Sequence, residues 1–274
     1  LRIHGTDTIF GVPGESYLAA LDALYAQRNS IRYVICRQEG GAANMAEAYG
    51  KLTGKPGIAF VTRGPGATNA SIGLHTGFQD STPMILLVGQ VARETTDREA
   101  FQEIDYRHMF GQMAKWVTQI EDARRIPELI SQAFHRAMNG RPGPVVVALP
   151  EDMLVDEVEV ADAGPYKTAR GAPSPDDIAR LRALLEKAER PMVIVGGGGT
   201  GAAGSNVIRR ERESMLPAPF RPKAIQQLWL HSMRGTPISL NMPNPTRRNG
   251  TRSERSPAAS DVPVLDGPHD PPSG

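Results

Sequence analysis

The chain has 274 residues, enough for one large or two modest domains, and its net charge of +1 is the sum of two unlike parts. Up to Gly199, 21 Lys and Arg against 24 Asp and Glu give −3, and from Thr200 onward 10 against 6 give +4, so neither part is charged strongly enough to make nucleic acid the natural partner. Cys36 is the only cysteine, which excludes an intrachain disulfide and a cysteine-based zinc site and fits a reducing cytoplasm, and no apolar run approaches the roughly 18 residues of a membrane span.

The first part of the chain alternates short apolar runs with longer helical patterns, which is typical of β-α-β units and a parallel sheet. Residues 1–4 followed by Gly5 have the pattern of a last helical turn with a glycine cap, so we expect further chain upstream. Strands are predicted at residues 8–12, 32–36, 57–62 and 84–88, and helices at 17–28, 39–53 and 67–78. The third and fourth strands are continuously apolar, as parallel strands covered on both faces should be.

The polar section 93–105 has no sustained periodicity, and a connection of this length inside a compact domain is usually functional or mobile. A further strand is predicted at 115–118, an amphipathic helix at 126–138 and a last strand at 145–149. The six strands predict one α/β domain over residues 1–152, in which a parallel sheet has helices on both faces.

The composition changes after this domain. Residues 153–173 have the composition of a linker, and Ser174 and Pro175 then open a helix that runs to about Ala188. A strand predicted at 191–196 makes residues 174–199 the start of a second α/β domain. Residues 200–274 carry 11 of the 23 prolines and no period that would bury a sheet face, so we expect a disordered tail. So abrupt a break suggests a changed reading frame or an artificial junction, which the coding DNA past Gly199 would reveal.

A glycine pattern lies at this break. Residues 199–204 fit the G-x-G-x-x-G spacing of a dinucleotide-binding turn. No periodic helix follows, and no acidic residue ends a second strand about 20 residues later. Only the glycine spacing therefore favours the interpretation as a dinucleotide-binding protein.

Chemistry-bearing side chains follow two of the predicted strands, where ligands of parallel sheets bind. Glu39 precedes a helix, and its carboxylate could simply favour the positive end of the helix dipole. Gly64-Pro65-Gly66 could simply be a tight turn, because it lacks the spacing of a P-loop. His75 in mid-helix is more typical of a packed or partly exposed position than of catalysis. The acidic pair Glu151-Asp152 is more typical of a solvated strand end.

Seven strings in a single order carry a resemblance to a known family. They are Phe10-Gly11-Val12-Pro13-Gly14, Arg37-Gln38-Glu39-Gly40-Gly41-Ala42-Ala43, Gly54-Lys55-Pro56-Gly57, Val61-Thr62-Arg63-Gly64-Pro65-Gly66-Ala67-Thr68-Asn69, Asp80-Ser81-Thr82-Pro83-Met84, Phe101-Gln102-Glu103 and Arg141-Pro142-Gly143-Pro144-Val145. With these strings, residues 1–199 resemble the N-terminal, pyrimidine-binding domain of thiamine diphosphate enzymes of the acetolactate synthase group.

The resemblance implies a catalytic role for Glu39, because the matching glutamate of the family bonds the aminopyrimidine ring of thiamine diphosphate and promotes loss of the thiazolium C2 proton. It implies that further residues line the pyrimidine pocket, namely Pro13, Gly14, Thr62, Pro65 and Asn69. Phe101 and Gln102 would face the reacting end of the cofactor. The family reaction is decarboxylation of a 2-keto acid followed by carboligation to a second carbonyl.

The chain also departs from the family. A complete enzyme has a further domain with a Gly-Asp-Gly segment and an asparagine that bind Mg2+ and the diphosphate, and no Gly-Asp-Gly occurs here. The middle domain, which carries FAD in the synthases, stops after its first strand. We therefore expect no metal ligands in this chain, poor cofactor binding and no turnover. Because such domains pair in the family, one alternative is a non-catalytic module that pairs with itself or with a full-length relative; another makes the basic tail a nucleic-acid arm.

Overall fold

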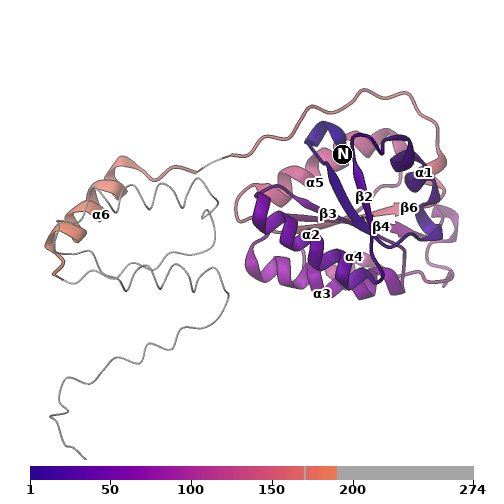
Figure 1. Cartoon of the computed structure of the whole chain (residues 1–274), viewed down its shortest axis with the longest axis horizontal. Helices are drawn as coiled ribbons and strands as arrows, with labels where there is room; N and C mark the ends of the chain where they lie inside the picture. Colours follow the sequence, from indigo (N-terminus) through magenta and orange to yellow (C-terminus); the bar gives the residue numbers. More distant parts are fainter. Residues whose placement is uncertain (170, 190–274) are drawn as a thin grey trace, which may run out of the picture. The chain divides into compact units, whose positions relative to one another are not determined.

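The computed structural model describes residues 1–169 and 171–189, and Figure 1 shows their elements. Six parallel strands form one sheet in the order β2-β1-β3-β4-β6-β5. The strands are β1 (Thr8–Gly11), β2 (Arg32–Ile35), β3 (Gly57–Val61), β4 (Met84–Gln90), β5 (Trp116–Gln119) and β6 (Pro144–Pro150). The predicted six-stranded parallel α/β sheet is confirmed.

Helices cover both faces of the sheet. Successive residues of a strand point to opposite faces, so each strand contributes to two cores. Ile85 and Leu87 of β4 pack in the core that contains α1 (Leu18–Ala26) and α5 (Ile126–Met138). The intervening Leu86 and Val88 pack in the second core. That core contains α2 (Glu39–Thr53), α3 (Pro65–Asp80) and α4 (Tyr106–Phe110).

Short 3-10 helices and one further α-helix complete the described elements. They are η1 (Arg2–His4), η2 (Glu15–Tyr17), η3 (Arg93–Thr95), η4 (Ala123–Arg125), η5 (Met153–Val155) and α6 (Pro175–Lys187). Helix α6 begins as predicted at Ser174, whose hydroxyl accepts a 3.1 Å hydrogen bond from Asp177 N. The predicted strand at 191–196, the G-x-G-x-x-G pattern and the predicted tail lie outside the described residues. None of the helices described is both long and apolar enough to cross a membrane.

Helices α2 and α3 approach closely because small residues line their contact. A Cβ on Gly73 would lie 2.5 Å from the carbonyl carbon of Ala43, and Ala43 and Ala46 are fully buried. The small-residue face of α2 is therefore used inside the domain. Both ends of α2 fall where predicted, with Gln38 as N-cap and Gly54 in the left-handed region at the C-terminus.

Two local predictions differ from the structure. Leu18 and Tyr25 of α1 are 63% and 67% exposed, although in the helix predicted at 17–28 they share one apolar face with Leu21 and Leu24. At about 100° per residue, Leu21 and Leu24 share the core-facing side, whereas Leu18 lies on a neighbouring side of the helix. Helix α4 was not predicted, because five residues show no period; Asp105 starts it by accepting from Arg107 N and His108 N.

Candidate functional site

The strand order contains a switch point at β1 and β3. From β1 the chain continues to β2 on one side, and from β3 it continues to β4 on the other side. Ligands of parallel sheets bind at the carboxyl ends of such a pair of strands. Pro13 and Gly14 follow β1, and Thr62 and Pro65 come after β3. Four of the candidate residues therefore lie at this position, although they come from segments about 50 residues apart.

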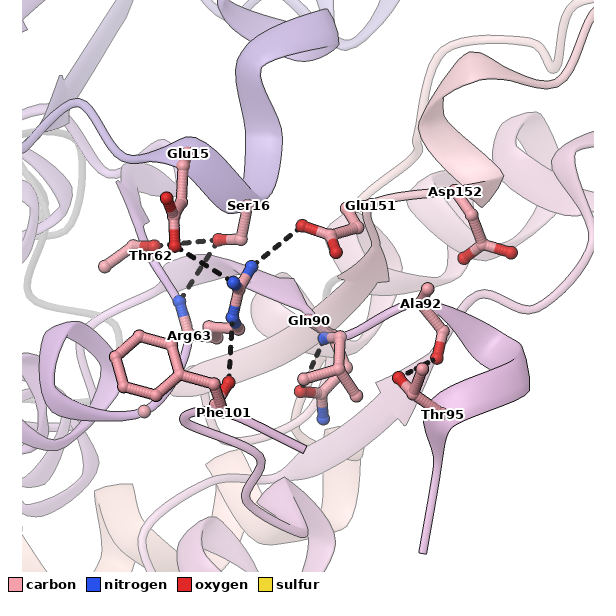
Figure 2. A network of polar contacts seen from close by, with 12 residues as sticks. Glu15, Ser16, Thr62, Arg63, Gln90, Ala92, Thr95, Phe101, Glu151 and Asp152 are labelled. Carbon is pink, nitrogen blue, oxygen red and sulfur yellow. Dashed lines mark hydrogen bonds and ion pairs between the residues drawn. The ribbon is translucent and has the colours of Figure 1, made fainter. Parts of the chain in front are cut away.

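The two turns touch each other directly. A Cβ on Gly14 would lie 2.4 Å from Thr62 Cβ, so only glycine allows this approach. Ser16, which is fully buried, shares a 2.8 Å hydrogen bond with Thr62 Oγ1 and accepts one of 3.2 Å from Arg63 N. In Figure 2, dashed lines join Ser16 to Thr62 and to Arg63. Ser16 was missed by sequence reasoning, since a serine after a turn has no local signal for a contact 46 residues away.

The Glu39 carboxylate is turned toward the Gly-Pro-Gly turn. Its Oε2 accepts a 3.0 Å hydrogen bond from Asn69 Nδ2, and its Oε1 is 3.4 Å from the position of a Cβ on Gly66. The neighbouring Gln38 caps α2, accepting from Gly41 N at 3.0 Å. Glu39 is therefore not the residue that caps its own helix, and it faces the start of α3.

The segment with Phe101 and Gln102 also reaches the β3 turn. Gly64, with a φ of +57°, leaves room for Gln102, whose Cβ would be 2.7 Å from a Cβ on Gly64. Gly64 N donates a 3.0 Å hydrogen bond to Tyr106 Oη. Burial raises the pKa of Tyr106 to about 12, so this acceptor stays a neutral hydroxyl at neutral pH. The Phe101 side chain is 74% exposed, and only its backbone joins the site.

Two arginines bind the acidic pair that follows β6. Arg63 Nη1 lies 2.8 Å from Glu151 Oε2, and Arg93 Nε lies 2.7 Å from Asp152 Oδ2. Burial raises the pKa of Asp152, but the hydrogen bonds from Arg93 outweigh it and leave that pKa below its usual value. The two acidic side chains remain 41% and 33% exposed, as expected of a solvated strand end, but their arginine partners, 88 and 59 residues away in the sequence, were not predicted.

The candidate residues lie on an open face of the domain. Pro13, Pro65 and Asn69 are exposed and Glu39 is half-buried. Three cavities elsewhere in the described residues have other linings, one around Lys115 and His135, one around Trp116 and Asp122, and one around His4 and Tyr49. Among the described residues, no group of three or more His, Cys, Asp or Glu side chains is placed to hold a metal ion.

Comparison with known proteins gives the family. Residues 1–109 match the family described as "Thiamine pyrophosphate enzyme, N-terminal TPP binding domain". The chain is 38% identical over 208 residues to the acetolactate synthase of Arthrospira platensis, which covers 72% of this chain. It is 36% identical over 201 residues to the acetolactate synthase isozyme 2 large subunit of Escherichia coli K12, again over 72% of this chain. Residues 1–109 therefore belong to the family of N-terminal TPP binding domains of thiamine pyrophosphate enzymes.

A solved structure has a similar fold. The crystal structure of benzoylformate decarboxylase from Polynucleobacter necessarius has a TM-score of 0.65 and 26% sequence identity to this chain. It covers 70% of this chain, and this chain covers 36% of it. The chain likewise spans 36% of the length of both acetolactate synthases. The chain thus spans about a third of the length of each of these relatives. The resemblance predicted from its motifs is confirmed.

Proposed function

We propose that this domain is the pyrimidine half of a thiamine diphosphate site in an acetolactate synthase-like decarboxylase and carboligase, with Glu39 as the group that bonds the aminopyrimidine ring. One observation carries the proposal. Asn69 fixes Oε2 of Glu39, while Oε1 is turned toward Gly66 and receives no hydrogen bond from the described residues. An acceptor held in one orientation and left with a free oxygen is suited to a ligand nitrogen.

The surrounding residues fit an aminopyrimidine ring. Gly66 has no Cβ, and one would lie 2.7 Å from Thr62 Cγ2 and 3.4 Å from Glu39 Oε1, filling the space before the carboxylate. Thiamine diphosphate, when bound, supplies the electron sink for cleaving the carboxylate from a 2-keto acid. Glu39 would hold and move a proton at Oε1, and Asn69 would keep the carboxylate from rotating. Pro13, Gly14, Thr62 and Pro65 would line the ring, with Phe101 and Gln102 on the substrate side.

The other half of the site would come from elsewhere. The sequence contains no Gly-Asp-Gly segment, so we propose that residues outside it hold Mg2+ and the diphosphate. A 2-keto acid would be the substrate of the complete enzyme, and FAD would belong to its middle domain. By itself this chain would bind the cofactor weakly, with a Kd of about 1 mM or above, and would consume no pyruvate.

The proposal can be tested by recording backbone amide NMR shifts during titration with thiamine and with thiamine diphosphate plus Mg2+. We expect shifts at Gly14, Gly66 and Asn69, with similar millimolar affinities for both ligands, because only the pyrimidine side is present. Glu39→Gln should abolish the shifts, and Thr76→Ala, an exposed α3 change away from Glu39, should keep them. Shifts absent at Gly66 and Asn69 would contradict the pyrimidine site. Micromolar affinity for the diphosphate would contradict a half-site.

A second candidate function is association, and exposed apolar side chains favour it. On α2, Met45 and Leu52 are 41% and 86% exposed, and on α3 Ile72 is 61% exposed. These could pair two copies of the domain or join it to a full-length relative. Sedimentation should then show a dimer that Leu52→Lys weakens and Glu39→Gln leaves intact; a wild-type monomer at high concentration would dismiss self-association.

A further inference from the structure

Arg63 joins four segments of the chain at the carboxyl ends of the strands. It follows β3, and its side chain is only 9% exposed. Nη2 lies 3.0 Å from Glu15 Oε1, beside β1, and Nη1 lies 2.8 Å from Glu151 Oε2, after β6. Nε donates a 3.2 Å hydrogen bond to the carbonyl of Phe101. Figure 2 shows the guanidinium among these three partners.

The charges around Arg63 exclude a role in binding a substrate anion. Two carboxylates, Glu15 and Glu151, already face the single positive charge, so the group of three carries a net negative charge. Such a group repels a 2-keto acid carboxylate, and each nitrogen of the guanidinium already has a partner. The one uncharged partner, the Phe101 carbonyl, lies in the segment predicted to face the substrate.

The segment 97–103 has a backbone that needs to be held. Asp97, Glu99 and Gln102 have φ values of 63°, 54° and 67°, three of the four positive values among the non-glycine residues described. Such conformations are disfavoured for L-residues and persist where surrounding contacts determine them. Within the segment, Glu103 accepts from Asp97 N and Ala100 N, which shapes the loop but does not attach it to the domain.

The attachment of this segment comes from the β3 turn. Beyond residue 103 the chain is held by Gln90, which donates to the Ile104 carbonyl at 3.0 Å, and by the bond from Gly64 N to Tyr106. At Phe101 the hydrogen bond comes from Arg63, and Gln102 packs on Gly64. Arg63 therefore holds the part of the segment that carries Phe101 and Gln102.

We propose that Arg63 is a positioning residue that places the Phe101–Gln102 segment against the β3 turn through the Phe101 carbonyl, with Glu15 and Glu151 orienting its guanidinium. The placement of the segment by Arg63 does not depend on the proposed thiamine site, whereas any effect of Arg63 on the reaction rests on that site. Arg63 would act on the reaction through Gln102 and without touching the substrate.

The experiment compares Arg63→Gln with Arg141→Gln by hydrogen–deuterium exchange on the full chain. Arg141 is a matched control, because its guanidinium also joins two segments, bonding Ser81 Oγ and the Phe78 carbonyl, but at the other ends of the strands. Arg63→Gln should speed exchange of the Asp97, Ala100 and Glu103 amides about tenfold and leave β3 and β4 amides unchanged. Arg141→Gln should leave the 97–103 amides as in the wild type. Arg63→Lys, which keeps the charge, should give an intermediate rate and replaces the glutamine variant if that one does not fold.

Unchanged exchange at 97–103 in the Arg63 variants, or equal acceleration in Arg141→Gln, would overturn the proposal. A thiamine titration of the same variants separates it from the proposed function. In the wild type we expect shifts at both Gln102 and Gly66; in Arg63→Gln the Gln102 shift should disappear while that of Gly66 remains. Without any thiamine shifts in the wild type, the proposed function fails, and the exchange rates still decide the role of Arg63.

Discussion

Asn69 donates a 3.0 Å hydrogen bond from its side-chain amide to Oε2 of Glu39, joining the start of α3 to the start of α2. The two residues are 30 positions apart, and their helices follow β2 and β3, which lie on opposite sides of β1. Because Asn69 binds one carboxylate oxygen, the other is presented to the space in front of Gly66. The orientation of the proposed acid–base group therefore depends on a second residue.

Replacing Asn69 tests this dependence. Asn69→Ala should raise the Kd for thiamine about 3- to 10-fold, because the carboxylate loses its orienting donor. The free energy of unfolding should change by less than about 1 kcal/mol, since Asn69 is exposed. NMR titration and urea unfolding measure the two quantities, with Thr76→Ala as the control. An unchanged thiamine Kd would mean that Asn69 does not orient Glu39.

Gly64 should be far less tolerant of a side chain than Gly54, although both have positive φ values, +57° and +69°. A Cβ on Gly54 meets no atom within 4 Å, so Gly54→Ala should cost about 1 kcal/mol of backbone strain. A Cβ on Gly64 would lie 2.7 Å from Gln102 Cβ and 2.8 Å from its carbonyl oxygen. Gly64→Ala should therefore cost about 3 kcal/mol or more in urea unfolding. Equal losses of unfolding free energy in the two variants would show that the Gln102 segment can move away from residue 64 without a cost.

Thr82, in the turn before β4, and Glu47 of α2 form a buried polar pair. Thr82 Oγ1 donates a 2.7 Å hydrogen bond to Glu47 Oε1, and the two residues are 2% and 8% exposed. Thr82→Val keeps the shape but removes the donor, so the free energy of unfolding should fall by about 2 kcal/mol. Thr82→Ser keeps the hydroxyl and should cost about 1 kcal/mol or less. If serine were as destabilising as valine, the methyl group and not the hydrogen bond would be the source of the stability.

His4 should make the domain less stable in mild acid. Burial lowers the pKa of His4 below its usual 6.5, and its Nδ1 accepts a 3.2 Å hydrogen bond from Tyr166 N while its ring stacks on Phe134. The unfolded chain takes up the proton more readily, so this contribution to stability is complete above about pH 6.5 and is lost as the pH falls through the folded-state pKa. Urea midpoints at pH 7.5 and 5.5 measure the loss.

The matched variant for this pH effect is His4→Phe, which keeps an aromatic ring against Phe134 but cannot be protonated. The difference between its urea midpoints at the two pH values should be smaller than that of the wild type. Equal differences in the two proteins would assign the pH dependence to other groups.

Much of the fold could be predicted because its signals are local. The bounds of α2 and α5 agree with the predicted ranges, since a glycine cap ends α2 and a regular apolar period marks α5. The third and fourth strands were recognisable as continuous apolar runs. Helix α3 extends two residues further at each end than predicted, from Pro65 to Asp80, because proline is accommodated in a first helical turn. The positions of the candidate residues at strand ends followed from the same signals.

What the sequence by itself determined is the alternation of strands and helices, and the ordered motifs that indicate the thiamine pyrophosphate enzymes. Only the tertiary structure decided the strand order, the meeting of Gly14 with Thr62, and the partners of Arg63. The physical reason is that a period or a cap depends on neighbouring residues, whereas a contact between Arg63 and Glu151, 88 positions apart, depends on which strands become neighbours in the sheet. That order is set by packing helices against both faces of the sheet, and no local pattern contains it.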